Sequence, residues 1–240
     1  MTSDGFRPRL LNSTIRSHFS TLRLNQTLNA ASTAFLDPER DDAVAALGEL
    51  TGETALRDIL TRMMADDVGR RIVQERWEIT EATMKIEELP NFPKHSFGRC
   101  YSNFLRTHGF SPDERKPVQH IQDPELAYVM QRYRQVHDFW HVLCGIQPTV
   151  LGEIAIKWFE MVQTQLPVAT LSAFIGPLRL APSEMFELWT RYVPWAASSA
   201  KNSKFLMNVP YEEHLLTDIY ALRKELGIVA FDEYQYVEDV

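Results

Sequence analysis

The sequence predicts an all-α protein, a single helical domain with a helix-turn-helix metal site, and three observations support this fold class. Apolar residues recur at every third or fourth position from about residue 37 onward, which is the spacing of one face of an α-helix. Helix-capping residues stand at the ends of these segments. No stretch of alternating apolar and polar residues longer than four positions indicates a β-strand.

The composition is that of an ordinary globular protein. The 240 residues are 45% apolar and 24% charged, and the chain is long enough to bury a core without disulfides. The net charge of -7 argues against a nucleic-acid surface, which needs clustered Lys and Arg. Cys100 and Cys144 are the two cysteines, so the sequence indicates a reducing compartment. No apolar run approaches the roughly 18 residues of a membrane-spanning helix, so we expect any membrane contact to be peripheral.

Residues 1–33 differ in composition from the rest of the chain and predict a targeting segment. They contain a single acid, Asp4, together with several serines and threonines. Their basic residues are Arg7, Arg9, Arg16 and Arg23. This Arg-rich, Ser-rich and acid-poor composition is typical of an organelle transit peptide, and a flexible N-terminal tail is the alternative. We assign residues 34–240 to the single helical metal-binding domain.

The first half of the chain is expected to be helical, with one irregular segment. Asp37 caps a helix that ends at Gly52, and residues 52–76 carry apolar side chains at helical spacing. The segment 91–117 is rich in Pro, Gly and aromatic residues and predicts loops around a short helix. Asp123, with the proline that follows it, predicts the start of a long helix.

Further helices are expected after this long helix. The sequence predicts the second helix of the metal site and then two more helices. A final amphipathic helix is predicted over residues 212–227, where Gly227 ends it.

Two histidines four residues apart carry the clearest chemical signal. His137 and His141 lie on the same face of the predicted long helix, about one turn apart, so their imidazoles can point at one ion. Asp138 follows the first histidine and precedes the second by three residues, so its carboxylate can reach the same edge. The HExxH metalloproteases use the same spacing of histidines on a helix.

Glu153 joins this group only if the chain reverses after His141. On a continuous helix the two residues would lie about 18 Å apart, outside any coordination sphere. Gly145 can end the first helix, and Pro148 suits the first turn of the next one. Two antiparallel helices would then bring Glu153 back over the His137 turn, so that four ligands converge.

The predicted ligand set suits Zn²⁺, because it combines two imidazoles with two carboxylates, while Fe²⁺, Mn²⁺ and Co²⁺ are alternatives. The alternative to a metal site is a buried helix whose two histidines are satisfied by hydrogen bonds. Cys144, three residues after His141, is a further candidate ligand, although a buried free cysteine is the more common role.

Three cations near the predicted ligands have two interpretations each. Arg134 lies four residues before the aspartate and can orient it or form an ordinary helical ion pair. Lys157 lies four residues after the glutamate and can neutralise it or hold an anionic substrate group. Arg179 is a lone cation in the apolar segment 166–189, whose small residues allow close helix packing or leave room for a long apolar ligand.

The segment "ELAYVMQRYRQVHDFWHVLCGIQPTVLGEIAIKWFE" closely resembles the ubiquinone-biosynthesis family of mitochondrial coenzyme Q proteins. "LGELTG" upstream and "FIGPLRL" downstream belong to the same resemblance, which covers about residues 30–229. The family's H-D-x-x-H-x(11)-E signature is matched at His137, Asp138, His141 and Glu153. The first 30 residues and the C-terminal "FDEYQYVEDV" lie outside the resemblance.

The resemblance implies a helical, zinc-binding protein that is peripheral on the matrix face of the inner mitochondrial membrane. The implied partners are polyprenylated aromatic lipids, the membrane surface and the other enzymes of the coenzyme Q biosynthetic complex, while a homo-oligomer stays open. The implied reaction removes the ring C1 carboxylate of 4-hydroxy-3-methoxy-5-polyprenylbenzoate and gives 2-methoxy-6-polyprenylphenol. In an oxidative version of this step, a hydroxyl replaces the carboxylate.

Two other functions are compatible with the residues. The first is a non-catalytic scaffold and polyprenyl-lipid binding protein whose zinc only braces two helices. The second is a metal-dependent phosphohydrolase of the HD type, for which His120 and Asp218 are the available additional ligands. Release of CO₂ from the prenylated hydroxybenzoate distinguishes the decarboxylase from the scaffold.

Overall fold

The computed structural model describes residues 48–115, 117–232 and 235–237. Within these ranges the chain is all-α, as the sequence predicts, with helices α3 to α12, short 3-10 turns and no β-strand. The targeting segment predicted over residues 1–33 and the helix start predicted at Asp37 lie outside the described residues.

The α-helices have the following bounds. Those before the metal-site segment are α3 (Glu53–Ala65), α4 (Asp67–Glu75), α5 (Glu81–Met84) and α6 (Phe97–His108). The remaining ones are α7 (Pro124–Cys144), α8 (Val150–Thr164), α9 (Pro167–Ile175), α10 (Pro182–Glu187), α11 (Val193–Asn202) and α12 (Ile219–Leu226).

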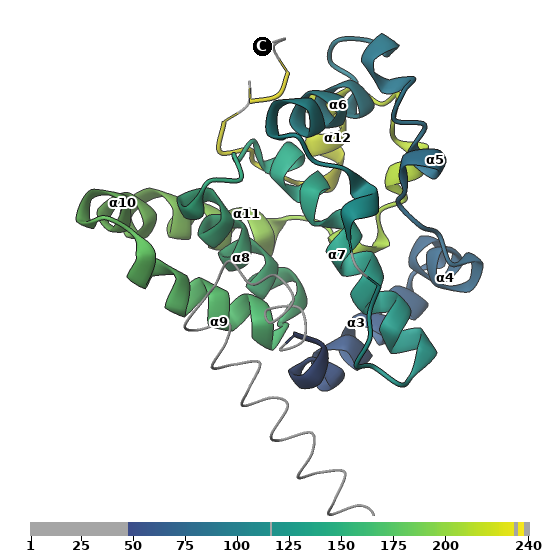
Figure 1. Ribbon diagram of the computed structural model, residues 1–240, viewed down its shortest axis with the longest axis horizontal. Helices are drawn as coiled ribbons and strands as arrows, with labels where there is room; N and C mark the ends of the chain where they lie inside the picture. Colours follow the sequence, from purple (N-terminus) through teal and green to yellow (C-terminus); the bar gives the residue numbers. More distant parts are fainter. Residues whose placement is uncertain (1–47, 116, 233–234, 238–240) are drawn as a thin grey trace, which may run out of the picture.

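Helix α7 runs through the middle of the fold (Figure 1). Helices α3, α4 and α6 pack against it, and α12 packs against α6. Helix α8 follows α7 after a short turn, and α9 and α11 both pack on α8. Of the two helices that carry the predicted ligands, α7 therefore packs with α3, α4 and α6, and α8 packs with α9 and α11.

Local sequence explains the bounds of α7, which agree with the prediction. The Asp123 side chain accepts hydrogen bonds from the backbone N–H groups of Glu125 and Leu126 and so caps the first turn. Pro124 occupies the first helical position, where its missing N–H costs nothing. Gly145 ends the helix in the left-handed region, with φ of 64°.

One predicted helical segment is divided in the structure. Residues 52–76 form α3 and α4 because Asp66 leaves helical geometry between them. Its carboxylate accepts the backbone N–H groups of Val68 and Gly69 at 2.9 and 2.8 Å, which caps α4. Local capping here overrides the continuous apolar spacing.

The sequence predicts the number of helices after α8 correctly, but the last of them is shorter than predicted. The two helices predicted after α8 are α9 and a continuous helix from Pro182 to Asn202, which includes a π-helical turn at Leu188–Tyr192. The final helix begins at Ile219 and not at residue 212, because Asp218 caps it with hydrogen bonds to two backbone N–H groups.

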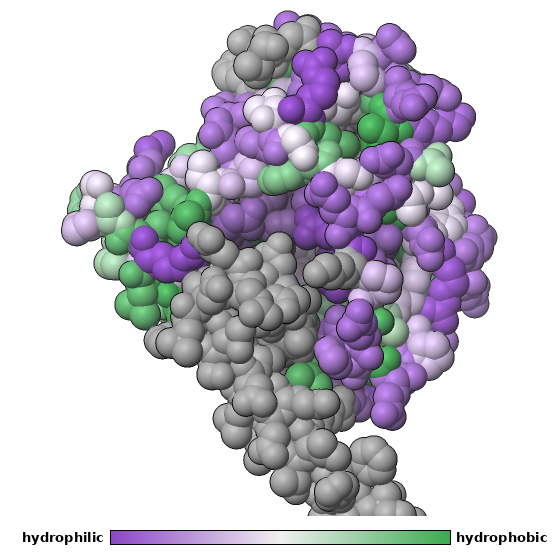
Figure 2. Space-filling view, viewed as in Figure 1, coloured by the Kyte–Doolittle hydropathy of each residue, from purple (hydrophilic) through white to green (hydrophobic). Residues whose placement is uncertain are grey.

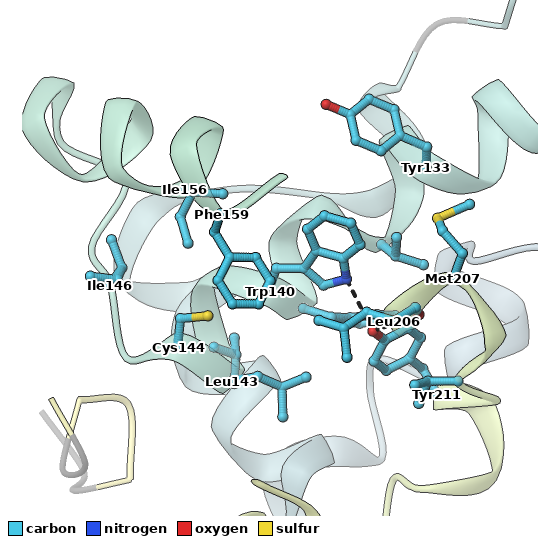
Figure 3. Close-up of a cluster of buried hydrophobic side chains, with 14 of the residues drawn as sticks. Tyr133, Trp140, Leu143, Cys144, Ile146, Ile156, Phe159, Leu206, Met207 and Tyr211 are labelled. Carbon is cyan, nitrogen blue, oxygen red and sulfur yellow. Dashed lines mark hydrogen bonds between the residues drawn. The ribbon is translucent and has the colours of Figure 1, made fainter. Parts of the chain in front are cut away.

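Trp140 anchors the core where α7, α8 and the segment Leu206–Tyr211 meet (Figure 3). Its ring is fully buried, and its centroid lies 6.0 Å from that of Phe159 on α8. Its indole N–H donates to the Tyr211 hydroxyl at 3.0 Å, so the buried donor is satisfied. This packing fixes the rotation of α7 and with it the direction of the neighbouring His141.

The apolar segment 166–189 packs α9 onto α8 with its small residues. Ala169 and Ala173 are fully buried, and a Cβ on Gly176 would lie 2.8 Å from the Ile154 side chain of α8. Six larger apolar residues of the segment face outward and form a patch over α9, α10 and the turns that adjoin them (Figure 2). This exposed patch consists of Leu171, Phe174, Ile175, Leu178, Phe186 and Trp189. Among the described residues, no helix combines the length and the apolar character needed to cross a membrane.

Candidate metal centre

A tight turn brings α8 back against α7, as the helix-turn-helix prediction requires. Gly145 has a positive φ, and a Cβ there would lie 1.8 Å from the Asp232 carbonyl oxygen, so only glycine fits. Thr149 caps α8 by accepting the N–H of Gly152 at 3.1 Å. Pro148 was predicted in the first turn of α8, but it precedes the cap.

Three of the four predicted ligands come together at this turn. The Nε2 atoms of His137 and His141 lie 3.2 Å apart. One Glu153 oxygen lies 3.3 Å from Nε2 of His137, and the other lies 3.2 Å from Nε2 of His141. These residues form a group that could hold a metal ion. The two imidazoles are nearly buried, whereas the side chain of Glu153 is 40% exposed, so the group opens toward solvent on the glutamate side.

The other ring nitrogens of both histidines have acceptors of their own. Nδ1 of His141 lies 3.0 Å from the carbonyl oxygen of Ile146, and Nδ1 of His137 lies 2.5 Å from Oε1 of Glu160. A carbonyl and a carboxylate both accept, so each Nδ1 carries the proton. In the neutral form of the two rings, the Nε2 lone pairs face one another and the Glu153 carboxylate, and this arrangement suits a cation between them.

The spacing of the two imidazoles fits a tetrahedral ion. Zn–N distances of about 2.0–2.1 Å at a tetrahedral angle separate two ligand atoms by roughly 3.3 Å. The two Nε2 atoms, 3.2 Å apart, match this value. The two Glu153 oxygens each approach a different imidazole, and one ligand atom from each of the three residues lies within 4.8 Å of the others. The chemistry of the donors and the separation of the imidazoles therefore fit zinc.

The charges of the group support one another. Burial raises the pKa of Glu153, but the imidazoles of His141 and His137 outweigh it and hold this pKa well below its ordinary value. Burial and the Lys157 ammonium lower the pKa of His137, while Glu160 and Glu153 together raise it above its ordinary value. Burial also disfavours ionised Glu160, yet Lys157 and His137 lower its pKa to about 2. Both glutamates are therefore carboxylates at neutral pH.

Asp138 does not belong to this three-residue group. Its buried carboxylate forms an ion pair and a hydrogen bond with Arg115. Burial lowers the pKa of the Arg115 guanidinium, but the Asp138 carboxylate raises it, and the resulting pKa lies above its ordinary value. Asp138 as a fourth ligand stays a prediction.

The predicted neighbouring cations have other contacts. Arg134 lies 3.5 Å from Glu49, and the guanidinium against Asp138 is that of Arg115. Lys157 forms its ion pair with Glu160 at 2.8 Å instead of with the glutamate one turn before it. Arg179 is exposed at the end of the 3-10 turn after α9.

The remaining candidates lie away from the three-residue group. Cys144 is a buried free thiol of the core, as its alternative interpretation expected. Asp218 caps α12. Among the described residues, the group that could hold a metal ion contains neither His120 nor Asp218, the two additional ligands that an HD phosphohydrolase requires.

Sequence reasoning missed three residues that support the group. Glu160 and Arg115 make the contacts described above, and Tyr133 donates to Oε2 of Glu160 at 2.5 Å. Glu160 lies seven residues after Glu153, a two-turn spacing on one helix face that could have indicated it. Tyr236, in the C-terminal stretch outside the resemblance, also reaches the site, since its hydroxyl lies 3.2 Å from the Ile146 carbonyl that accepts from His141.

Comparison with protein families matches residues 17–232 to the family described as "Coenzyme Q (ubiquinone) biosynthesis protein Coq4". The chain belongs to the Coq4 family. The match extends beyond residues 30–229, the extent read from motifs, at both ends.

Curated relatives support the family assignment along most of the chain. The human "Ubiquinone biosynthesis protein COQ4 homolog, mitochondrial" is 42% identical over 216 residues, which are 89% of this chain and 82% of the human protein. The bovine relative of the same name is 43% identical over 214 residues, covering 88% and 81% of the two chains. A relative from Laccaria bicolor named "Ubiquinone biosynthesis protein COQ4, mitochondrial" is 41% identical over 202 residues, with 83% and 68% covered.

A crystal structure shares the fold. It is that of a protein from Nostoc punctiforme PCC 73102 whose name assigns it provisionally to ubiquinone biosynthesis, and the TM-score is 0.68. The alignment covers 85% of this chain and 97% of the other, at 17% sequence identity. At that identity the likeness establishes the fold alone.

Proposed function

We propose that this Coq4 family member decarboxylates 4-hydroxy-3-methoxy-5-polyprenylbenzoate at ring C1, giving 2-methoxy-6-polyprenylphenol, with Zn²⁺ held by His137, His141 and Glu153. The observation that carries this proposal is the convergence of two buried imidazoles on a glutamate whose side chain is 40% exposed. The imidazoles provide a firm hold, and the partly exposed glutamate side of the group is the side that a substrate oxygen can approach. Asp138 remains our predicted fourth ligand.

The side chains around the group suit a carboxylate substrate. The side chains of Arg115 and Lys157 are 33% and 21% exposed, and their charges act on Glu153 and His137 respectively, so these two cations can orient an anionic group near the ligands. If Asp138 turns toward the ion, the Arg115 guanidinium becomes available to the substrate carboxylate. Zn²⁺, when bound, supplies a Lewis acid that stabilises negative charge on substrate oxygens.

The proposed step needs a proton at one defined atom. The bond between ring C1 and the carboxylate carbon breaks, CO₂ leaves, and a proton adds to C1. Asp138, next to His137 in the sequence, and Glu153, whose oxygens lie within 3.3 Å of the imidazoles, are the candidate carriers of that proton; Glu153, ionised at neutral pH, would first take the proton up from solvent. The buried histidine side of the group keeps water away from the reacting ring.

We also propose that the protein is peripheral on the matrix face of the inner mitochondrial membrane and works with the other enzymes of the coenzyme Q biosynthetic complex. Two observations support this. The curated relatives are named mitochondrial, and the exposed patch on α9 and α10 offers apolar side chains to lipid or to a polyprenyl tail.

The direct test uses purified zinc-loaded protein and the prenylated hydroxybenzoate labelled at the carboxylate. We expect labelled CO₂ and a prenylphenol product in equal amounts. Reactions under argon and under air would show whether oxygen takes part. A protein that binds zinc and the prenylated acid but releases no CO₂ in either atmosphere would contradict the decarboxylase.

Glu153→Gln distinguishes the enzyme from the zinc-braced scaffold. Gln keeps the size and one oxygen donor but removes the charge, so the decarboxylase predicts a loss of product with little loss of stability. The scaffold predicts lower melting temperature and weaker complex assembly, with no separate loss of chemistry. Glu187→Gln, on the exposed face of α10, is the matched control and should change neither readout.

A further inference from the structure

We propose that Glu160 is the positioning residue that fixes His137 for metal binding, and that Tyr133 and Lys157 hold Glu160 in place. This inference rests on the proposed metal site and concerns residues that support a ligand without binding the ion themselves. Glu160 is fully buried on α8, two turns after Glu153, and it touches the ion group only through His137.

Every known contact of the Glu160 carboxylate is with a donor. Oε1 lies 2.5 Å from Nδ1 of His137. Oε2 accepts from the Tyr133 hydroxyl at 2.5 Å and from the Lys157 ammonium at 2.8 Å. A carboxylate can accept on both oxygens, so all three donors are satisfied at once and the His137 proton stays on Nδ1. The Nε2 lone pair of His137 is thereby directed at the ion site.

The two histidines differ in the group that accepts the hydrogen bond from Nδ1. His141 donates to the Ile146 carbonyl of the turn, so the backbone alone sets its tautomer. His137 lies inside the helix pair, where it depends on the Glu160 side chain. A carboxylate behind a ligating imidazole also makes the ring a stronger donor to the metal. A single substitution at Glu160, which does not bind the ion itself, can therefore change how strongly His137 binds the metal.

Glu160→Gln tests this dependence because an amide cannot satisfy the same three donors. Tyr133 and Lys157 both require an acceptor, so they draw the amide oxygen to their side. The amide NH₂ then faces Nδ1 of His137, which must accept, and the ring proton moves to Nε2. That proton blocks the metal-binding lone pair.

The measurement is Zn²⁺ affinity of the full chain by competition with a chromophoric chelator. We expect Glu160→Gln to weaken zinc binding about 10- to 100-fold. Glu187→Gln on exposed α10 is the control and should bind as the wild type does. Unaltered zinc affinity in a folded Glu160→Gln protein would overturn the inference, even if the variant is less stable, because that result describes a merely structural ion pair.

A second readout uses the wild-type protein and does not depend on the folding of a variant. In the zinc-loaded protein the Nδ1 proton of His137 should give a far-downfield NMR signal, because it lies in a short hydrogen bond to a carboxylate. A zinc-loaded wild type without a proton on Nδ1 of His137 overturns the inference. A wild type that fails to bind zinc at all contradicts the proposed metal site instead, so the two failures are distinguishable.

Discussion

The α7–α8 pair and the α9–α10 region are neighbours in the fold, yet they place polar and apolar residues in opposite ways. Between α7 and α8, the Glu160 carboxylate, two imidazoles and a tyrosine are buried, and the carboxylate is hydrogen-bonded to one imidazole and to the tyrosine. In the α9–α10 region, large apolar side chains are exposed, such as Leu178 in the turn between the helices, at 72%, and Phe186 on α10, at 71%. Burying polar groups and exposing large apolar side chains both cost folding free energy, so folding alone does not account for either placement.

This contrast indicates which parts of the fold face a ligand. Buried charge is retained where a second ion or a proton can satisfy it, and exposed apolar surface is retained where an apolar partner covers it. Trp158 on α8 joins the two regions, because its ring centroid lies 4.8 Å from that of Phe174 in the patch, so a ligand with an anionic head and an apolar tail suits both.

Trp140→Ala should destabilise the protein by about 3–5 kcal/mol, because it empties a fully buried site beside the histidines. Trp189→Ala removes the same side chain from the exposed patch, where it is 45% exposed, and should cost less than about 1 kcal/mol. Urea unfolding of both variants measures the difference. If the two variants lose the same free energy of unfolding, the expected contrast between the core and the exposed patch is contradicted.

Leu178→Glu combined with Phe186→Glu should weaken binding to vesicles of phosphatidylcholine and cardiolipin by more than about tenfold. Burial of each side chain in lipid is worth about 1.5–3 kcal/mol, and the new charges add repulsion. Zinc content should stay at the wild-type level, because the patch lies outside the ligand group. Vesicle flotation provides the measurement.

Leu216→Glu is the control for the vesicle experiment, since Leu216 is 66% exposed in the turn before α12. We expect it to leave flotation unaltered. If the control weakens binding as much as the patch variant does, the patch is not the surface that contacts lipid.

The two thiols should be nearly unreactive in the native protein. Burial raises the pKa of Cys100 to about 12, and it raises the pKa of Cys144 as well. A raised pKa keeps the thiol protonated at pH 8, and only the thiolate reacts. Ellman's reagent should therefore detect almost no thiol before denaturation and two after it. Rapid labelling of the native protein at pH 8 would contradict this burial.

The sequence predicts those features that depend on local interactions. The bounds of α7 follow from Asp123, Pro124 and Gly145, which act within one turn of the residues they cap. The pairing of His137 with His141 follows from helix periodicity alone. Glu153 required one further step, the reversal at Gly145, and the structure confirms that reversal.

The features that the sequence does not predict depend on contacts between distant segments. Arg115 reaches Asp138 across 23 positions from an irregular segment, and no periodicity links the two. Tyr133 and Glu160 meet across 27 positions, at a distance set by how α8 packs on α7. Arg134 has a contact of the same long-range kind, since its guanidinium lies 3.5 Å from Glu49, while its predicted role toward Asp138 stays a prediction.

The central claim is that the α7–α8 turn binds one divalent ion through His137, His141 and Glu153. Elemental analysis of the purified full chain, combined with circular dichroism, tests it most directly. We expect about one zinc per chain in the wild type and none in a His137→Ala, His141→Ala double variant that keeps its helical signal, because neutral imidazoles are the main anchors. A folded double variant with undiminished zinc would contradict the account.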